Sequence, residues 1–349
     1  MAAPRIPLRI GVVQLNPKIG QVQANLAKAK ELCRKITPNS LDLLCFPEMA
    51  FTGYAFDSAS SIRPFLEKPQ IGPTSQFCSE LAKHLQCYVA AGYPEELTQD
   101  EIDSEETKKR EEDQLYAFEK PKEREVVGAN SAVIYGPEGE LVGGYRKTNL
   151  FETDMTWATP GTGFLSIALP SPLRNITLGI CMDLNPHPPA KWMSLEGGPY
   201  EVAEYALEHR SNVVILLNAW LLSDEDKREL EDEEEEGDQA EEKAGKENQH
   251  AWTTLNFWAA RLRPLWASKC PPSRESDDEQ SPTSTDEKEA ELINDETIVV
   301  VCNRSGKENG REFAGSSAVF SMKRNSGRPT LLDMMGVEQE GVRIWSLLI

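Results

Sequence analysis

Histidine is scarce in this chain, with only four among 349 residues, and the seven cysteines form no C-x-x-C pair. An odd cysteine count without such pairs indicates neither a disulfide framework nor a zinc motif. No apolar run approaches the ~20 residues that a membrane-spanning helix needs. The N-terminal residues lack a secretory hydrophobic segment, and no glycine pattern fits a P-loop or a dinucleotide fingerprint. We expect a cytoplasmic or nuclear protein with no membrane partner, no metal and no cofactor.

Basic residues are also in deficit, with 37 Lys and Arg against 57 Asp and Glu and a net charge of -20. Most of that charge lies in two tracts. Residues 223–249 hold 14 acids against 4 bases, and residues 270–297 hold 10 acids against 2. Segments of this composition bury too little apolar surface to order themselves, so we predict two disordered acidic insertions. The rest of the chain is nearly neutral, and we expect no nucleic-acid partner.

Apolar runs alternate with amphipathic segments along most of the remaining sequence. Strands are predicted at 8–15, 41–46, 87–93, 128–135, 140–147, 164–169, 176–180, 212–217, 297–302 and 312–320. Helices are predicted at 22–35, 75–85, 200–209 and 251–263, and residues 95–125 form a charged surface excursion. This alternation is typical of an α/β protein, with hairpins adding antiparallel pairs.

Three chemically competent residues each follow an apolar stretch: Glu48 after Leu43–Pro47, Lys147 after a run at 140–146, and Cys181 after Ile176–Ile180. Open α/β sheets place their reactive groups at the carboxyl ends of strands. A base, a cation and a thiol are the groups needed to cleave an amide through a covalent intermediate.

Each of the three also has a simpler interpretation, since Cys181 could be a core cysteine, Glu48 a solvated strand end and Lys147 a surface lysine. A thiol needs a base or a cation to become a nucleophile, and the usual partner is histidine. His187 lies near Cys181 in sequence, but between two prolines in a turn, which favours a surface position. Glu48 in apolar surroundings is the better base, because burial raises a carboxyl pKa toward neutrality.

The motifs Phe46-Pro47-Glu48, Tyr145-Arg146-Lys147 and Gly179-Ile180-Cys181, in this order and spacing, resemble the Glu-Lys-Cys triad of the nitrilase (carbon-nitrogen hydrolase) superfamily. Residues 14–25, 303–306 and 313–317 resemble its opening and closing segments. Within the superfamily, residues 181–186 and 254–258 are similar to the fungal branch that deamidates N-terminal Asn and Gln of proteins. The resemblance implies a four-layer α-β-β-α sandwich, expected here as one domain over residues 1–349.

The resemblance also implies roles for single residues. Glu48 is the expected base, Cys181 the nucleophile, and Lys147 with the Met182 backbone N–H the oxyanion site. Family members commonly carry a second glutamate downstream of the lysine. Here Glu152 and Asp154 are the candidates, and counting back from Pro160-Gly161 favours Asp154. Asp183 is interpreted as a turn carboxylate rather than a contact to the substrate's α-ammonium.

The implied activity is hydrolysis of the side-chain amide of N-terminal Asn or Gln, giving Asp or Glu and ammonia and feeding N-terminus-dependent degradation. The expected partners are therefore proteins or peptides, in an oligomeric state that the sequence leaves open. Two alternatives remain at this point. One is a small-molecule amidase or nitrilase of the same superfamily. The other is a non-catalytic interaction protein that binds through its acidic tracts.

Overall fold

Two six-stranded sheets form the centre of the structure, a computed structural model that describes residues 6–115, 125–236, 249–268 and 295–349. The first sheet has the order β14-β1-β2-β3-β4-β5 and the second the order β13-β12-β9-β8-β7-β6. In each sheet three parallel strands lie together, β1-β2-β3 in one and β7-β8-β9 in the other, with antiparallel strands on both sides. The first sheet consists of β1 (Pro7–Gln14), β2 (Leu43–Cys45), β3 (Tyr88–Glu96), β4 (Gly128–Tyr135), β5 (Leu141–Arg146) and β14 (Gly341–Leu348). The second consists of β6 (Leu165–Ala168), β7 (Asn175–Ile180), β8 (Val213–Asn218), β9 (Glu296–Asn303), β12 (Ala318–Lys323) and β13 (Thr330–Met334), and a small ribbon pairs β10 (Lys307–Glu308) with β11 (Arg311–Glu312).

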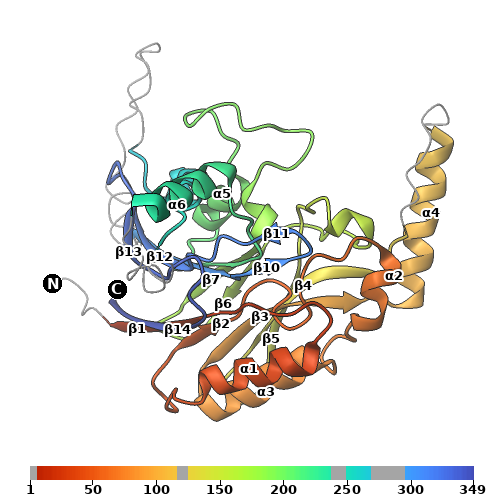
Figure 1. The fold of residues 1–349 in the computed structure, drawn as a ribbon, viewed down its shortest axis with the longest axis horizontal. Coiled ribbons are helices and arrows are strands. Elements are labelled where there is room, and N and C mark those ends of the chain that lie inside the picture. The colour runs from red at the N-terminus through yellow and green to blue at the C-terminus, as the bar shows by residue number, and fades with distance from the viewer. Residues whose placement is uncertain (1–5, 116–124, 237–248, 269–294) are drawn as a thin grey trace, which may run out of the picture.

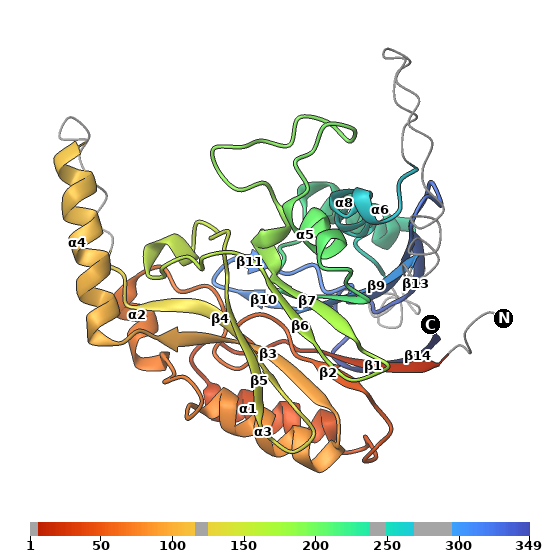
Figure 2. The same ribbon diagram turned by 180° about the vertical axis from the view of Figure 1, so that it is seen from behind.

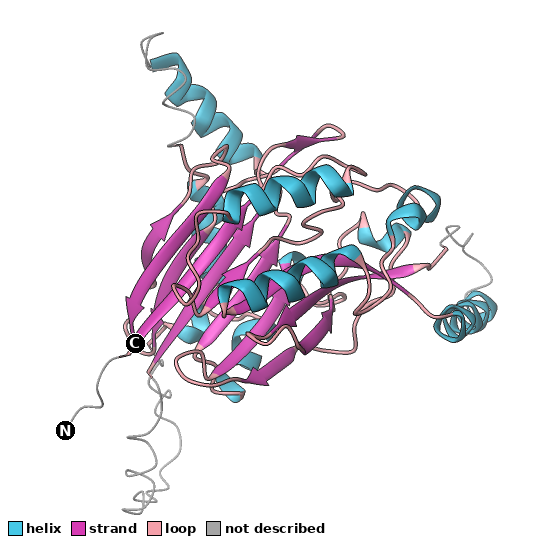
Figure 3. Cartoon of the chain, turned by 90° about the horizontal axis from the view of Figure 1, so that it is seen from below, coloured by secondary structure: helices cyan, strands magenta, loops and turns pink. Residues whose placement is uncertain are grey.

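Helices cover the outer face of each sheet, so the layers run α-β-β-α as predicted (Figures 1 and 3). Helices α1 (Val22–Cys33) and α3 (Pro73–Leu85) lie on the first sheet, and α5 (Glu201–Glu208) and α8 (Trp252–Arg261) on the second. Short helical segments fill the connections: α2 (Ala59–Ile62), η1 (Arg63–Phe65), η2 (Asp154–Thr156), η3 (Cys181–Leu184) and η4 (Arg263–Leu265).

Alternating side chains of β1 show how the core is divided between the layers. Leu8, Ile10 and Val12 join the apolar cluster between the two sheets, whereas Val13 packs toward the outer helices. Successive side chains of a strand point to opposite faces, so a strand buried on both faces is apolar throughout. The sheets are thereby held face to face with the carboxyl ends of their parallel strands close together, and these ends carry the candidate site.

The first acidic tract differs from the prediction, because residues 224–236 form helix α6 (Asp224–Glu236). Asp226 is fully buried, and its carboxylate accepts hydrogen bonds from the backbone N–H groups of Thr253 and Thr254 at the start of α8. Leu230 packs against a small apolar cluster that includes Leu222. The expectation of disorder is therefore wrong for residues 224–236. The prediction used the average composition of the tract, which does not reveal that Asp226 is buried and that Leu230 packs against the core. Residues 237–248 and 269–294, which hold most of the other predicted disorder, lie outside the described residues.

Further differences concern helix α4 (Gln99–Leu115) and the C-terminal strands. The charged excursion contains α4, which projects from the body beyond β3 (Figure 2). Its first turn is held by an ion pair of Glu101 with Arg146, 2.8 Å between Oε1 and Nη1. The strand predicted at 312–320 is two strands, β11 and β12. The C-terminal residues supply β13 and β14, and β14 pairs with β1 over its full length.

Candidate active site

Glu48 follows β2 by three residues and is fully buried. Its Oε1 accepts hydrogen bonds from Lys147 Nζ and Asn130 Nδ2, both at 2.7 Å, and its Oε2 accepts the Ala219 N–H at 2.7 Å. Burial raises the pKa of the Glu48 carboxyl, and Lys147 only partly offsets this. A Cβ atom added at Gly92 would lie 2.6 Å from the Glu48 Cα, so glycine is required there for the chain to pass.

Lys147 follows β5 and is also fully buried. Its Nζ lies 2.7 Å from Glu48 Oε1 and 2.6 Å from Asp154 Oδ2. Burial acts to lower the pKa of Lys147, but the Asp154 and Glu48 carboxylates together raise it well above its usual value. The ammonium has three N–H donors. Glu48 and Asp154 accept two of them, and the ammonium also lies 5.6 Å from the centroid of the Tyr54 ring. The third donor is the one that can bind a substrate oxygen.

Asp154, one of the two acidic residues between which the sequence left the choice open, is the one that contacts Lys147. It is fully buried at the start of η2, and it accepts hydrogen bonds from Lys147, Asn130 and the Phe151 N–H. Glu152 is exposed, and its Oε1 lies 3.4 Å from Arg311 Nη2. Only the aspartate therefore contacts the lysine.

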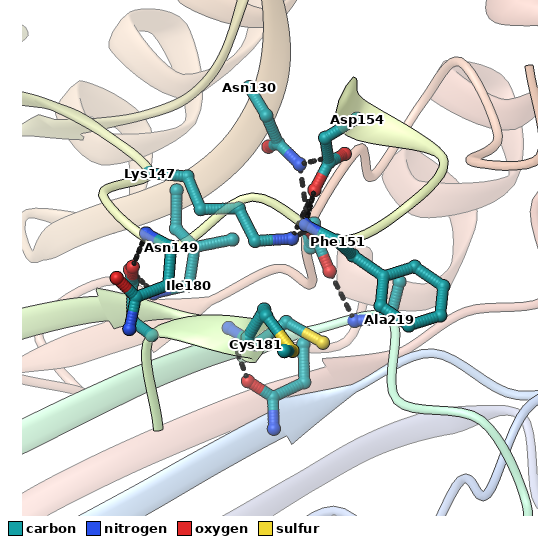
Figure 4. A network of polar contacts seen from close by, with 12 residues as sticks. Asn130, Lys147, Asn149, Phe151, Asp154, Ile180, Cys181 and Ala219 are labelled. Carbon is teal, nitrogen blue, oxygen red and sulfur yellow. Dashed lines mark hydrogen bonds and ion pairs between the residues drawn. The ribbon is translucent and has the colours of Figure 1, made fainter. Parts of the chain in front are cut away.

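Cys181 is the first residue of η3, at the carboxyl end of β7, and only 8% of its surface is exposed. Figure 4 shows its side chain beneath the Lys147 amine, with the sulfur directed toward Ala219. Burial and the nearby Glu48 carboxylate raise the pKa of the thiol well above its usual value, against the opposing effects of Lys147 and the Ala219 N–H. The resting thiol is therefore protonated and needs a base. Met182 follows it in the same turn.

Asp183 connects the cysteine turn to the segment that follows Lys147. Its buried carboxylate accepts the N–H groups of Thr148, Asn149 and Ile180 and the hydroxyl of Tyr145. The distances are 2.9, 2.8, 2.8 and 2.7 Å in that order. These contacts agree with the interpretation of Asp183 as a structural carboxylate.

Two asparagines of the site were not predicted from the sequence. Asn130 in β4 donates to both Glu48 and Asp154, at 2.7 and 3.0 Å, and thus holds the two carboxylates on either side of Lys147. Asn218 at the end of β8 accepts the Cys181 N–H at 3.0 Å. Two signals were available in the sequence: Asn130 is a polar residue inside a mostly apolar strand, and Asn218 lies at a strand end. The strand-end rule applied to Asn218 would have found it.

The histidines take no part in this network. His187 Nδ1 contacts Asn149 Oδ1 at 2.5 Å, and its ring is exposed. Within the described ranges, no three His, Cys, Asp or Glu side chains are grouped so that they could hold a metal ion. No helix of those ranges is long and apolar enough to cross a membrane.

Comparison with known proteins places this geometry in a family. The carbon-nitrogen hydrolase family matches residues 9–206, more than half of the chain and the part that contains Glu48, Lys147 and Cys181. The chain belongs to the carbon-nitrogen hydrolase family. The expected superfamily is thereby confirmed, and the protein is a carbon-nitrogen hydrolase.

Among curated relatives of this carbon-nitrogen hydrolase, the protein N-terminal amidase of Schizosaccharomyces pombe is 31% identical over 97% of this chain and 99% of its own length. The protein N-terminal amidase of Saccharomyces cerevisiae is 30% identical over 62% of this chain and 46% of its own. A crystal structure of an N-terminal amidase superposes with a TM-score of 0.72 at 20% identity, covering 99% of this chain and 98% of that one. At that identity the superposition supports the fold, and the predicted sandwich is confirmed.

Proposed function

We propose that this protein deamidates N-terminal Asn and Gln of proteins and peptides, releasing ammonia. The observation that carries the proposal is the buried Glu48–Lys147–Asp154 network beside Cys181, in a chain similar over 97% of its length to a protein N-terminal amidase. Solved structures of N-terminal amidases with Asn-Glu-Ala and Gln-Gly peptides share the fold, at TM-scores of 0.71 and 0.69.

In the first half of the reaction Glu48 takes the thiol proton as the Cys181 sulfur attacks the side-chain amide carbon. The S–C bond forms and the carbonyl oxygen becomes an oxyanion. The remaining Lys147 N–H and the Met182 backbone N–H hold this oxyanion, and donors of this kind are each worth about 3–4 kcal/mol of transition-state stabilisation. Glu48 then protonates the amide nitrogen, the C–N bond breaks, and ammonia leaves a thioester on Cys181.

In the second half Glu48 removes a proton from water, and the resulting hydroxide attacks the thioester carbon. The same donors hold the second oxyanion, and its collapse breaks the S–C bond. Cys181 is released and recovers its proton from Glu48, while the product carries a carboxylic acid where the amide stood, which then loses its proton to solvent. A base that takes and returns protons within one turnover works best with a pKa moved toward neutrality. Burial shifts the Glu48 pKa in that direction.

The biological consequence we propose is the conversion of an N-terminal Asn or Gln into Asp or Glu. Such a product feeds degradation that depends on the N-terminal residue, in the cytoplasm or nucleus. The substrates are therefore protein chains rather than free amino acids.

The test is ammonia release from matched substrates. Peptides that begin with Asn or Gln should be hydrolysed, whereas N-acetylated copies, free asparagine, free glutamine and simple nitriles should not. Glu48→Gln and Cys181→Ala should abolish release while far-UV circular dichroism stays unchanged. Release only from free amides or nitriles would instead favour a small-molecule amidase or nitrilase. No release from any substrate by folded protein would favour a non-catalytic protein.

A further inference from the structure

A row of three aromatic side chains, Trp220, Phe257 and Trp192, begins beside the site and is here called the aromatic row. Trp220 directly follows Ala219, whose N–H binds Glu48, and it packs against the apolar cluster that includes Cys181. The Phe257 ring centroid lies 5.6 Å from that of Trp220 and 5.7 Å from that of Trp192. The row therefore begins at the residue that follows the Glu48-binding Ala219 in sequence, and its three rings lie next to one another.

The three rings come from three separate segments, and all are partly exposed. Trp220 follows β8, Phe257 lies on α8, and Trp192 lies on the loop between η3 and α5. The match to the carbon-nitrogen hydrolase family ends at residue 206, so Trp220 and Phe257 lie outside it. Phe257 belongs to the 254–258 segment that resembles the N-terminal deamidating branch.

Arg261 fixes the outer end of the row to the nucleophile turn. Its guanidinium lies 5.1 Å from the ring centroids of both Trp192 and Tyr200. Its Nε donates to the carbonyl of Leu184, the last residue of η3, at 2.7 Å. Since Cys181 begins the same short helix, Trp192 is held in a defined position relative to the thiol.

Beyond Trp192 the loop presents more apolar surface to solvent. Met193 is 81% exposed and Leu195 is 39% exposed. The loop extends outward from the body in both Figures 1 and 2. Neighbouring exposed apolar side chains commonly mark a binding surface, and methionine adapts to varied partners because it is flexible and polarisable.

We propose that the aromatic row, with Met193 at its outer end, binds the second and third residues of the peptide whose first residue is deamidated. The proposal rests on the proposed function, since it names how that site selects a peptide over a small amide. Each step of the row is 5.6 or 5.7 Å, and an extended peptide advances ~3.3 Å per residue, so the row is long enough to lie along the second and third residues. Flat apolar rings contact side chains of many sequences, which suits an enzyme that reads only the first residue.

The test compares kcat/KM for Asn-initiated peptides of two to five residues. In the wild-type protein the value should rise with length, and more so when the second residue is apolar. Trp192→Ala and Phe257→Ala should lower kcat/KM for the tetrapeptide about tenfold, mainly through KM, and should lower the dipeptide value less, because a dipeptide has no third residue to contact the row. Trp192→Phe, which keeps a ring, should retain most of the length dependence.

Trp252→Ala is the matched control, because Trp252 lies on α8 and is 43% exposed but contacts His250 instead of the row. It should behave as wild type, and melting curves show that each variant is folded. Equal kcat/KM for short and long peptides, in a wild-type protein that deamidates both, would overturn the proposed binding role of the aromatic row but not the proposed function. A wild-type protein that deamidates no peptide would overturn the proposed function itself.

Discussion

The side chain of Asn218 accepts the backbone N–H of Cys181 at 3.0 Å. Cys181 has a φ of 43°, in the left-handed region that residues other than glycine seldom adopt. Asn218 ends β8, and the next residue, Ala219, donates its N–H to Glu48 at 2.7 Å. One strand end therefore positions both the nucleophile and its base.

Replacement of Asn218 by alanine should lower kcat by roughly 10- to 100-fold with a smaller change in KM, because the thiol loses its orientation toward the amide carbon. The unpaired Cys181 N–H should also lower the free energy of unfolding by about 1–3 kcal/mol. Steady-state kinetics and urea unfolding measure the two effects. Asn175→Ala at the opposite end of β7 is the control and should leave kcat unchanged. An unchanged kcat in Asn218→Ala would remove Asn218 from the positioning of Cys181.

Lys147→Met should abolish activity and destabilise the protein by about 3–5 kcal/mol, because it leaves Glu48 and Asp154 buried without their cation. The double variant Lys147→Met/Asp154→Asn removes one of the two carboxylates and should recover part of that stability while staying inactive. Urea unfolding of the wild type and both variants gives the comparison. A single variant as stable as the wild type would contradict the ion pairs described for Lys147.

The acidic limb of the pH–rate profile should report the pKa of Glu48. Burial raises the pKa of Glu48, and the neighbouring Asp154 carboxylate raises it further. Because the base must be ionised, kcat/KM falls as the pH drops through that raised pKa. Asp154→Asn removes a negative charge, lowers the Glu48 pKa and should move the limb to lower pH, whatever its effect on the maximal rate. Glu152→Gln, at the exposed neighbour, should not move it. A limb that stays in place or moves upward in Asp154→Asn would refute this assignment.

Glu67, which is not part of the site, should make the free energy of unfolding depend on pH. Its carboxylate is buried and binds the N–H and hydroxyl of Thr74 at 2.8 and 2.7 Å. Burial raises the pKa of Glu67 to about 7 from its usual 4.5. Because the pKa of Glu67 is higher in the folded than in the unfolded protein, its contribution to stability is fully present below the unfolded-state pKa. That contribution is lost as the pH rises through the folded-state pKa of about 7.

Between pH 5 and pH 8 the wild type should therefore lose about 2–3 kcal/mol relative to Glu67→Gln, whose side chain does not titrate. Urea unfolding of both proteins at the two pH values isolates this group from all others. A constant difference between them would show that Glu67 titrates normally in the folded protein.

Much of the site could be predicted from the sequence, because Glu48, Lys147 and Cys181 each follow a predicted apolar strand. The same local rule could not choose between Glu152 and Asp154, since their spacing to Lys147 differs by two residues in a loop. The choice depends on which carboxylate turns inward, and the structure gives Asp154. Asn130 acts through contacts with residues distant in sequence, which a local pattern does not contain.

In the fold as well, elements specified by their own sequence could be predicted, whereas elements that depend on contacts with distant residues could not. Strands β4 and β7 were predicted within one residue because apolar runs bounded by turn residues specify them. Strand β14 was missed because its exposed Ile344 and Leu348 give no buried pattern, and it forms by pairing with β1 at the other end of the chain. Helix α6 was missed because the contacts of Asp226 with α8 outweigh an unfavourable composition.

The most direct test of the central claim is mass spectrometry of the acid-quenched enzyme during turnover of an Asn-initiated peptide. We predict an adduct with the mass of the peptide less ammonia, mapped by proteolysis to the fragment that contains Cys181. The adduct and ammonia release should both be absent in Cys181→Ala. Ammonia release at the wild-type rate by Cys181→Ala, or an adduct on another residue, would contradict the assignment of Cys181 as the nucleophile.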